Sequence, residues 1–464
     1  MQTVAGATGQ GVAPPERASD VAERGSAPEP HPLAGARSPA DDCVHCGFCL
    51  PTCPTYVSWG EEMDSPRGRI DLFRALSDGR VTLDASVAQH FDACLGCMAC
   101  MTACPSGVRY DLVIERARAL VEEGSPRPLL ERLHRGLVFA LFPHPRRLRA
   151  VAFLLFIFRV TGLQWLFRRM GLLELASPKL AQLEALAPTV CARDVVGRLP
   201  ARTPAQGKQR LRVGLVAGCV QRVFFPGVNA ATIRVLTAEG CEVIVPKGQG
   251  CCGALSAHAG REDEARRMAM DVMARFEAAQ VDVIAVNAAG CGSTLKEYGR
   301  MFADDPAWST RAAAFSARVK DITELLASLE PRAQRRPFPA RIAYHSSCHL
   351  GHAQRLQDPP RALLRAIPGV ELLEIPEGEQ CCGSAGVYNL FQVESASEIG
   401  RRKATNVIAT NPELLASANP GCTLHIERFL RERGITLHAA HPIEIVDWSI
   451  RGCAPPAPRR TTRR

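Results

Sequence analysis

Two twelve-residue segments near the start of the chain carry the same cysteine pattern. Residues 43–54 and 94–105 both read Cys-x-x-Cys-x-x-Cys-x-x-x-Cys-Pro. This spacing is typical of paired four-iron clusters, in which the first three cysteines of each motif bind one cluster and the fourth binds the other. The pattern therefore predicts two [4Fe-4S] clusters. Their expected ligands are Cys43, Cys46, Cys49 and Cys104 for one cluster, and Cys94, Cys97, Cys100 and Cys53 for its neighbour.

Two other uses of paired cysteines agree less well with this pattern. A structural zinc site needs four ligands, but it needs neither a third regularly spaced cysteine nor a following proline. A disulfide framework is disfavoured because no secretory segment opens the chain, and thiolate clusters suit a reducing compartment. We therefore expect a cytoplasmic electron carrier.

The composition predicts a globular protein with disordered ends. The chain has 464 residues and is 46% hydrophobic, which is sufficient for about two to four domains with buried cores. Residues 1–40 are rich in Ala, Gly, Pro and Ser, and residues 454–464 are rich in Pro and Arg. Neither end shows apolar periodicity, so we expect both to be disordered.

The region that contains the two motifs, residues 41–125, is predicted to be mostly helical. The segment between Cys53 and Cys94 is long enough to need its own fold. Asp64-Ser65-Pro66 offers an N-cap and a first-turn proline for a helix over residues 67–76. Further helical patterns cover residues 87–91 and 110–123. We expect a helical ferredoxin domain here.

Residues 126–207 form a basic connector. The net charge of the chain is +9, and residues 127–170 contain nine arginines against one acid, Glu131. Apolar runs rich in Phe and Leu alternate with these arginines, which interrupt any window long enough for a transmembrane helix. Two interpretations stay open: a basic amphipathic segment in a membrane interface, or a helical hairpin packed on the cluster domain or a partner subunit. Nucleic-acid binding is not expected, because no binding motif accompanies the charge.

The rest of the chain is an internal repeat, which we assign to domains at residues 208–330 and 331–453. Each half contains a single cysteine, a Cys-Cys-Gly triplet and a further cysteine, at offsets of 129, 130 and 131 residues between the halves. In both halves, strand patterns alternate with helical patterns, which predicts a parallel sheet whose carboxyl edge gathers the cysteines. The candidate metal ligands are Cys219, Cys251, Cys252 and Cys291 in the first half, and Cys348, Cys381, Cys382 and Cys422 in the second.

This second set of cysteines indicates another redox or metal site, and buried structural cysteine is the alternative. The histidines around Cys348, which are His345, His349 and His352, could supply a ligand or a proton path, but each is expected to be a surface residue or to be hydrogen-bonded within the protein. His45 is expected to tune the first cluster through charge or hydrogen bonding. Cys191, Cys241 and Cys453 lie outside the repeat and are expected in the core or at the surface.

The complete pattern resembles a family of iron–sulfur subunits that includes those of glycolate oxidase, anaerobic glycerol-3-phosphate dehydrogenase and heterodisulfide reductase. The resemblance covers residues 41–452, and it is greatest to the glycolate oxidase iron–sulfur subunit in residues 43–49, 64–69, 287–298 and 381–389. The fold class that follows is α+β multidomain: an N-terminal α-helical ferredoxin-like domain, then a duplicated α/β Cys-Cys-Gly domain.

In one respect the chain departs from the heterodisulfide reductase type, whose Cys-Cys-Gly domains usually end in Cys-x-x-Cys. Here the two halves end in Cys291-Gly-Ser-Thr294 and Cys422-Thr-Leu-His425, so each lacks one thiolate. A five-cysteine cluster therefore cannot be transferred to this chain. The repeat is left with three options, which are a different iron–sulfur cluster, another metal, or no metal.

The resemblance implies a complex in which flavin-containing subunits oxidise glycolate to glyoxylate and this chain passes the electrons toward a membrane quinone or a similar acceptor. The substrate site is then expected on another subunit, and no catalytic residue is expected here. The location is expected to be cytoplasmic, either free or peripheral on the cytoplasmic face of the inner membrane. Alternatives are the iron–sulfur subunit of a D-lactate or anaerobic glycerol-3-phosphate dehydrogenase, and a thiol-disulfide reductase of the heterodisulfide reductase type.

Overall fold

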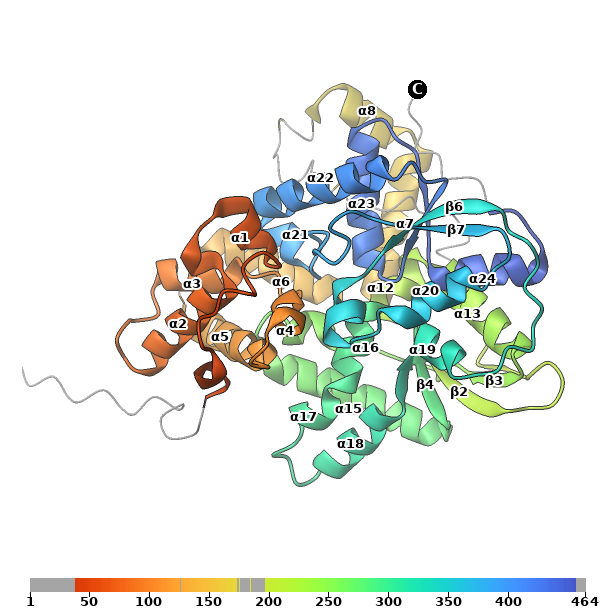
Figure 1. Cartoon of the computed structure of the whole chain (residues 1–464), viewed down its shortest axis with the longest axis horizontal. Coiled ribbons are helices and arrows are strands. Elements are labelled where there is room, and N and C mark those ends of the chain that lie inside the picture. Colours follow the sequence, from red (N-terminus) through yellow and green to blue (C-terminus); the bar gives the residue numbers. More distant parts are fainter. Residues whose placement is uncertain (1–37, 126, 173–174, 176–183, 185–196, 456–464) are drawn as a thin grey trace, which may run out of the picture.

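The computed structural model of the chain describes residues 38–125, 127–172, 175, 184 and 197–455. Most of the two ends that the sequence predicts to be disordered, and also Cys191, lie outside these ranges. Within them, a helical N-terminal region, three connecting helices and two parallel sheets follow one another along the chain (Figure 1).

The N-terminal region, residues 38–125, is helical, as the sequence predicts. Its elements are η1 (Pro39–Asp42), α1 (Pro54–Trp59), η2 (Glu62–Asp64), α2 (Pro66–Ser77), α3 (Ala85–Asp92), α4 (Ala99–Ala103) and α5 (Tyr110–Gly124). Helix α2 begins where the capping signal places it, because the Ser65 side chain accepts a hydrogen bond from the Gly68 N–H at 3.0 Å and Pro66 occupies the first turn. We call residues 38–125 the ferredoxin-like region.

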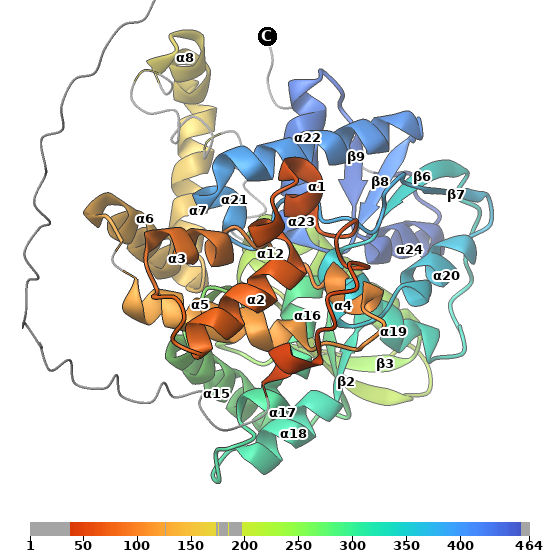
Figure 2. The ribbon, with the colours of Figure 1, turned by 60° about the vertical axis from the view of Figure 1, so that its left-hand side comes forward.

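Three helices follow, α6 (Leu129–Leu141), α7 (Pro145–Val160) and α8 (Leu163–Arg169). Val138 and Phe139 of α6 pack on Val387 and Leu390, and Leu148 of α7 packs in a cluster with α12 residues. Helix α8 buries none of its residues and lies at the outer end of α7 (Figures 1 and 2). Among the described helices none is long and apolar enough to cross a membrane by itself, and α7 and α8 reach that length only together, across a 71° bend.

The first sheet has the order β1-β3-β2-β4-β5. Its strands are β1 (Arg202–Thr203), β2 (Leu211–Val216), β3 (Cys241–Ile244), β4 (Val283–Val286) and β5 (Val319–Asp321). All neighbours are parallel except β1, which pairs antiparallel with β3. Its helices are α12 (Cys219–Phe224), α13 (Pro226–Ala238), α14 (Ala254–Ala257), α15 (Glu262–Ala279), α16 (Ala289–Lys296), α17 (Tyr298–Met301), α18 (Ser309–Ala317) and α19 (Ile322–Ala327).

The second sheet repeats this order as β7-β6-β8-β9, with every pair parallel. Its strands are β6 (Ala340–His345), β7 (Val370–Glu374), β8 (Leu414–Ser417) and β9 (His438–Ala440). Its helices are η3 (His349–Ala353), α20 (Asp358–Arg365), α21 (Tyr388–Phe391), α22 (Val393–Ala409), α23 (Pro420–Glu432) and α24 (Pro442–Arg451). The predicted duplicated α/β architecture is confirmed. Strand β1 extends the first sheet, although its residues lie in the range 126–207 that the sequence analysis assigned to the connector.

The two sheets share one core. Alternate residues of a strand point to opposite faces, so Leu215 of β2 and Tyr344 of β6 face a common apolar cluster, whereas Val216 faces a separate cluster with Phe276 of α15. The last helix, α24, belongs to the second half but packs on α13 of the first, where Arg234 pairs with Asp447 at 2.7 Å. The two halves therefore form one packed unit.

The ferredoxin-like region lies against both halves (Figures 1 and 2). Arg118 of α5 donates to the His258 carbonyl of the first half at 2.8 Å, and Arg300 pairs with Glu115 at 2.7 Å. On the second half, the Oγ1 of Thr102 lies 2.8 Å from the Nδ1 of His352. The two cysteine motifs are thereby fixed relative to the cysteines of the repeat.

Candidate iron–sulfur and metal sites

The first motif forms one wall of a hollow near the surface. The hollow has a volume of about 410 Å³ including its open side, and its lining includes the cysteines Cys43, Cys46, Cys49, Cys100 and Cys104. Cys104 comes from the second motif, so the structure brings together the four residues that crossed ligation requires, and Cys100 reaches the same hollow. This donor set of clustered thiols fits an iron–sulfur cluster. The assignment of each ligand stays a prediction.

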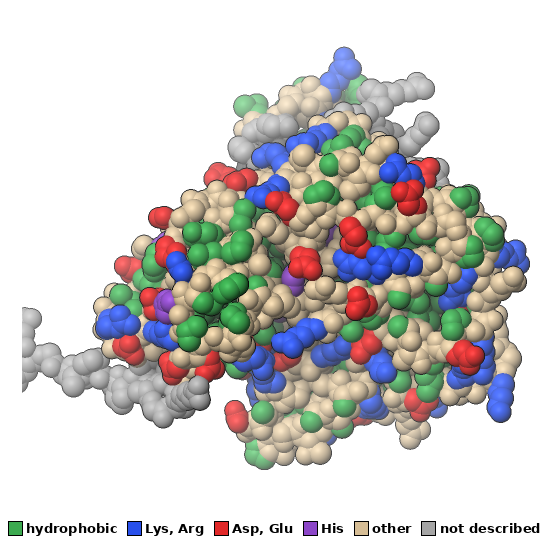
Figure 3. Space-filling model, in the orientation of Figure 1, with side chains coloured by type: hydrophobic (Ala, Val, Ile, Leu, Met, Phe, Trp, Pro, Cys, Tyr) green, Lys and Arg blue, Asp and Glu red, His purple; other side chains and the backbone are tan. Residues whose placement is uncertain are grey.

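The first motif is the more exposed of the two. Cys46 is exposed, and next to it Val44 and Phe48 are 67% and 65% exposed. Hydrophobic side chains gather on the face of the ferredoxin-like region that Figure 3 shows, whereas basic and acidic side chains are interspersed over the rest of that view. The ferredoxin-like region thus presents an apolar surface beside its outermost cysteine.

The second motif is buried and carries its own positive charges. Cys94, Cys97 and Cys100 are all buried, as is Cys53. Burial alone would raise the pKa of Cys94, but the guanidinium groups of Arg69 and Arg118 hold that pKa below its ordinary value. Burial and the neighbouring thiols raise the pKa of Cys100 well above its ordinary value. Buried thiols of this kind are stabilised as thiolates only by a metal or a nearby cation.

His45 lies beside charged side chains at the rim of the first motif. Its Nε2 is 3.1 Å from a terminal nitrogen of Arg74 and 3.4 Å from a carboxylate oxygen of Asp71. The role that the sequence suggests for His45, tuning of the first cluster, stays a prediction.

The cysteines of the first half follow the carboxyl ends of its strands. Cys219 opens α12 after β2, Cys251 and Cys252 follow β3, and Cys291 lies in α16 after β4. The sulfur atoms of Cys219 and Cys251 are 3.5 Å apart, and Tyr298 donates to the Cys252 carbonyl at 2.6 Å. These residues are candidate ligands, and Thr294, which stands where the lost cysteine would be, hydrogen-bonds the Gly290 carbonyl instead.

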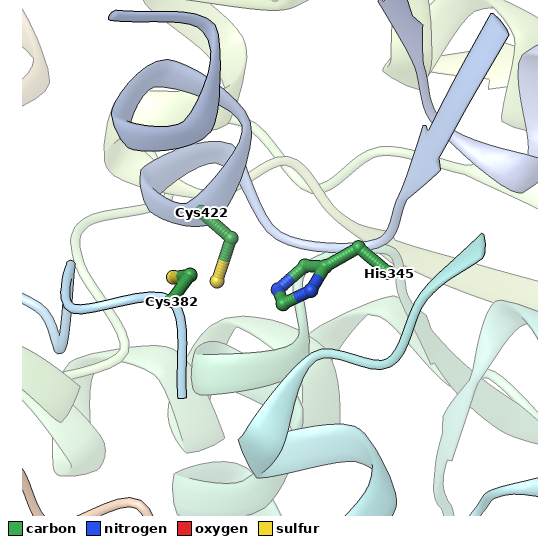
Figure 4. Close-up of side chains that lie close together, drawn as sticks. All are labelled: His345, Cys382 and Cys422. Carbon is green, nitrogen blue, oxygen red and sulfur yellow. The ribbon is translucent and has the colours of Figure 1, made fainter. Parts of the chain in front are cut away.

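The second half gathers its cysteines in the same way and adds a histidine. Cys382, Cys422 and His345 offer one sulfur or ring nitrogen each, and these three atoms all lie within 4.8 Å of one another. Figure 4 shows the Cys422 thiol between the Cys382 side chain and the imidazole, with His345 at the end of β6 and Cys422 on α23. The neighbouring Cys382 thiol and the His345 ring hold the pKa of Cys422 well below its ordinary value.

The expectation for the histidines around Cys348 is wrong for His345. This residue is fully buried, and within the described part of the chain its ring nitrogens have no partner other than the Cys422 thiol. The expectation is confirmed for the other two. His349 lies 2.7 Å from the Ser293 hydroxyl and 3.1 Å from the Gly96 carbonyl, and His352 has Thr102 and the Glu379 carbonyl as partners.

The histidine that replaces the lost cysteine of the second half is not directed at the thiols. His425 is buried, and its Nε2 lies 3.0 Å from the Ala396 carbonyl while its Nδ1 lies 3.3 Å from the Asn389 amide. His425 follows Cys422 in a Cys-x-x-His pattern, at the position of the lost thiolate. The available signal for His345 is its place directly after the strand pattern of residues 341–344, where a side chain reaches the carboxyl edge of the sheet.

The second motif and the second half meet directly. Cys97 packs in one buried cluster with Cys348 and Cys381, together with Tyr388. Burial and the Cys381 thiol raise the pKa of Cys97 well above its ordinary value. The predicted second cluster site is therefore adjacent to the cysteines of the second half. Cys241 lies outside both sites, in the common core, as the sequence predicts, and Cys453 packs against that core.

Three models of known families match the chain. A 4Fe-4S dicluster domain matches residues 39–108, the linker region of the glycolate oxidase iron-sulfur subunit matches residues 130–187, and a cysteine-rich domain matches residues 213–296 and 342–427. These matches agree with the three kinds of region that the structure contains.

Curated relatives match most of the chain. A probable glycolate oxidase iron-sulfur subunit of Bacillus subtilis is 38% identical over 411 residues, which are 87% of this chain and 93% of that protein. The glycolate oxidase iron-sulfur subunit of Escherichia coli is 36% identical over 416 residues, 88% of this chain and 93% of that protein. Lactate utilization protein A of Shouchella clausii is 28% identical over 238 residues, 51% of this chain and 99% of that protein.

Proposed function

Because this chain belongs to the family of glycolate oxidase iron–sulfur subunits, we propose that it is the electron-transfer subunit of a glycolate dehydrogenase complex. The observation that carries the proposal is similarity over 93% of two such subunits, combined with a structure that brings the cysteines of both motifs together. The chain is a subunit of an oxidoreductase. We propose that glycolate is oxidised to glyoxylate at a flavin held by partner subunits.

In this proposal the chain holds two [4Fe-4S] clusters, which accept and pass on single electrons when bound. Cys43, Cys46, Cys49 and Cys104 would hold one of them, and the buried set of Cys94, Cys97, Cys100 and Cys53 the other. Arg69 and Arg118 place positive charge beside the buried thiols. Such charge stabilises thiolate ligands and favours the reduced state of a neighbouring redox centre.

The exposed motif is the proposed contact for the electron donor. Electron transfer requires close approach, and the Cys46 side of the ferredoxin-like region is open and flanked by exposed Val44 and Phe48. An exposed apolar patch beside a redox site suits a partner protein. Electrons would then reach the buried motif, whose thiols interact with those of the exposed one through the pair Cys100 and Cys49.

We also propose that the exposed side of α7 and α8 contacts the cytoplasmic face of the inner membrane, where a quinone could take the electrons. Eight large apolar residues of this segment are 40% to 66% exposed, namely Phe153, Leu154, Ile157, Val160, Leu163, Trp165, Leu166 and Met170. We call them the exposed apolar face. Arginines lie along the same helices, and Arg169 stacks 5.2 Å from the Trp165 ring. Apolar side chains mixed with arginine and tryptophan suit an interface with anionic lipid.

The proposed function is tested by purifying the native complex under anaerobic conditions and adding glycolate, D-lactate or glycerol 3-phosphate. Bleaching of the iron–sulfur absorption by glycolate alone is the expected result. Bleaching by another of these substrates would assign the chain to a different dehydrogenase, whereas disulfide reduction by the isolated chain would make it a thiol-disulfide reductase.

A further inference from the structure

We propose that the second half, and not the first, binds a single divalent metal ion of the zinc class through Cys382, Cys422 and His345. The three donors come from three neighbouring parts of the sheet edge: the loop after β7, the first turn of α23 and the last residue of β6. Because β6 lies between β7 and β8, parallel pairing brings these carboxyl ends together. The fold therefore places the site, although its ligands are far apart in sequence.

The imidazole of His345 is the observation that points to a ligand. It is 0% exposed, and among the residues that the structure describes its ring nitrogens have no hydrogen-bond partner apart from the Cys422 thiol beside the ring. A buried polar group without an adequate partner destabilises the fold. The ring faces the sulfur atoms of Cys382 and Cys422, which are 1% and 3% exposed (Figure 4). A metal ion between the three groups would satisfy the imidazole and neutralise two buried thiolates.

The spacing of the donors favours one ion over a cluster. Zinc binds thiolate sulfur at about 2.3 Å and imidazole nitrogen at about 2.0 Å, so ligands of one tetrahedral ion lie roughly 3–4 Å apart. The three donors already lie within 4.8 Å of one another. A four-iron cube binds each thiolate at a different iron and holds the sulfurs farther apart. Cys381, adjacent in sequence and buried, can complete a closed four-coordinate site.

The first half has no equivalent of this site. Strands β2 and β6 correspond over their whole length, so His345 is matched by Val216, which packs in an apolar cluster. The corresponding thiols of the first half therefore lack an imidazole at this position. Since zinc has no redox chemistry in proteins, the ion would carry no electrons. With two thiolate ligands the site would carry no net charge, and it would fix the loop whose Cys381 packs with Cys97.

The test is the metal content of the full chain, purified anaerobically with and without its partners. We expect one zinc per chain in addition to iron in the wild type, and loss of the zinc with unchanged iron in His345→Ala. Replacement of the zinc by Co²⁺ should give the visible absorption of a tetrahedral ion with thiolate ligands, and this absorption should be absent in His345→Ala.

Two further variants keep the test decisive if His345→Ala folds poorly. His345→Cys supplies another metal-binding donor at the same place, and it should retain the zinc. His425→Gln removes a buried histidine of the same half whose ring nitrogens both have protein partners, and it should retain the zinc as well. The proposal is overturned if the wild type contains no zinc, if His345→Ala keeps it, or if the loss of His345 removes iron instead.

Discussion

The hydroxyl of Tyr388 donates a hydrogen bond to the backbone carbonyl of Ala93, 3.2 Å away and 295 positions earlier in the chain. Ala93 immediately precedes Cys94, whereas Tyr388 belongs to α21 of the second half. Both residues are buried. This contact holds the start of the second cysteine motif against the repeat, close to the cluster in which Cys97 meets Cys381.

Replacement of Tyr388 by phenylalanine should lower the stability of the second cysteine motif in its folded position. The change leaves the ring in place but leaves the Ala93 carbonyl buried without its partner, which costs about 1 kcal/mol. We expect the iron–sulfur absorption of Tyr388→Phe to bleach about fivefold faster in urea than that of the wild type. The matched control is Tyr344→Phe, because the Tyr344 hydroxyl is buried and has no hydrogen-bond partner among the described residues. Equal bleaching of Tyr388→Phe and wild type would contradict the role of this contact.

Arg69 should be essential to the ferredoxin-like region. Its side chain is 1% exposed and donates to the Asp64 carboxylate at 3.0 Å, to the Asp64 carbonyl at 2.7 Å and to the His90 carbonyl at 2.6 Å. Removal of one partner from a buried pair costs about 3–5 kcal/mol. Arg69→Met should therefore fold with little or no iron, as measured by iron content and circular dichroism.

The control for Arg69 is an ion pair on the surface. Arg80 lies 3.2 Å from Asp78, and both side chains are about 60% exposed. Such pairs contribute less than about 1 kcal/mol, so Arg80→Met should keep the iron content of the wild type. If Arg69→Met also keeps it, the buried pair is not needed to assemble the region.

The cysteine motifs and the repeat were predictable because the spacing of the cysteines is set by the cluster they surround in the motifs and by matching strand ends in the two halves. Helices α2, α3 and α5 begin and end within two residues of the predicted segments, since capping residues and apolar periodicity act locally. The parallel pairing of the strands followed from the alternation of strand and helix, whereas their order did not. By contrast, β1 has only two residues, and no alternation of apolar residues announces so short an edge strand.

The metal-binding histidine could not be chosen from the sequence. Three histidines surround Cys348, and a fourth follows Cys422 at a ligand-like spacing. The distinction comes from tertiary structure. His349, His352 and His425 have oxygen or nitrogen partners on elements remote in sequence, whereas among the described residues the neighbour of the His345 ring is the Cys422 thiol. Similarly, nothing local indicates that α24 packs on the first half, because that contact depends on the shared core.

Asp321 should make the protein less stable as the pH rises. Its Oδ1 accepts from the Thr323 N–H at 2.8 Å, but its buried Oδ2 has no hydrogen-bond partner in the described part of the chain, and burial raises the pKa of the carboxyl from 3.8 to about 6. The folded protein therefore holds this proton more tightly than the unfolded chain. The stability that protonation provides is present below pH 4 and is lost as the pH rises toward 6.

Asp321→Asn tests this relationship. The amide oxygen can still accept from Thr323, and the variant has no charge to bury. Since one pKa unit corresponds to about 1.4 kcal/mol, we expect a gain of up to about 3 kcal/mol at pH 8 and no gain at pH 4. Thermal unfolding at both pH values measures it. Asp78→Asn, at an exposed carboxylate, should show no such difference, and a gain for Asp321→Asn that is independent of pH would contradict the argument.

Crossed ligation predicts which cysteine variants should resemble each other. If Cys104 completes the site of the first motif, Cys104→Ser and Cys43→Ser should lose the same cluster, and Cys53→Ser and Cys94→Ser the other. Each variant should lose about half of the iron, with matching electron paramagnetic resonance spectra within each pair. Cys453→Ser, outside both motifs, should lose none. Ligation within each motif would instead make Cys104→Ser match Cys94→Ser.

The exposed apolar face of α7 and α8 should bind anionic membranes. The double variant Leu154→Glu, Val160→Glu replaces side chains that are 65% and 66% exposed, so the fold should tolerate it. Each apolar side chain contributes about 1.5–3 kcal/mol when it is fully buried. We therefore expect at least about tenfold weaker binding to vesicles that contain phosphatidylserine, measured by co-sedimentation at low and high salt.

The control for the membrane variant carries the same change of charge on another side of the molecule. Ala303 and Ala314 are exposed near α18, which lies at the opposite end of the structure from α8 in both ribbon views (Figures 1 and 2). Ala303→Glu, Ala314→Glu should bind the vesicles as the wild type does, apart from a small electrostatic effect that salt removes. Equal losses in the two double variants would mean that net charge governs the binding. An apolar contact with lipid predicts a loss of binding that is confined to the variant of Leu154 and Val160. Unchanged binding in both double variants would therefore contradict the membrane contact and favour a partner subunit on this face.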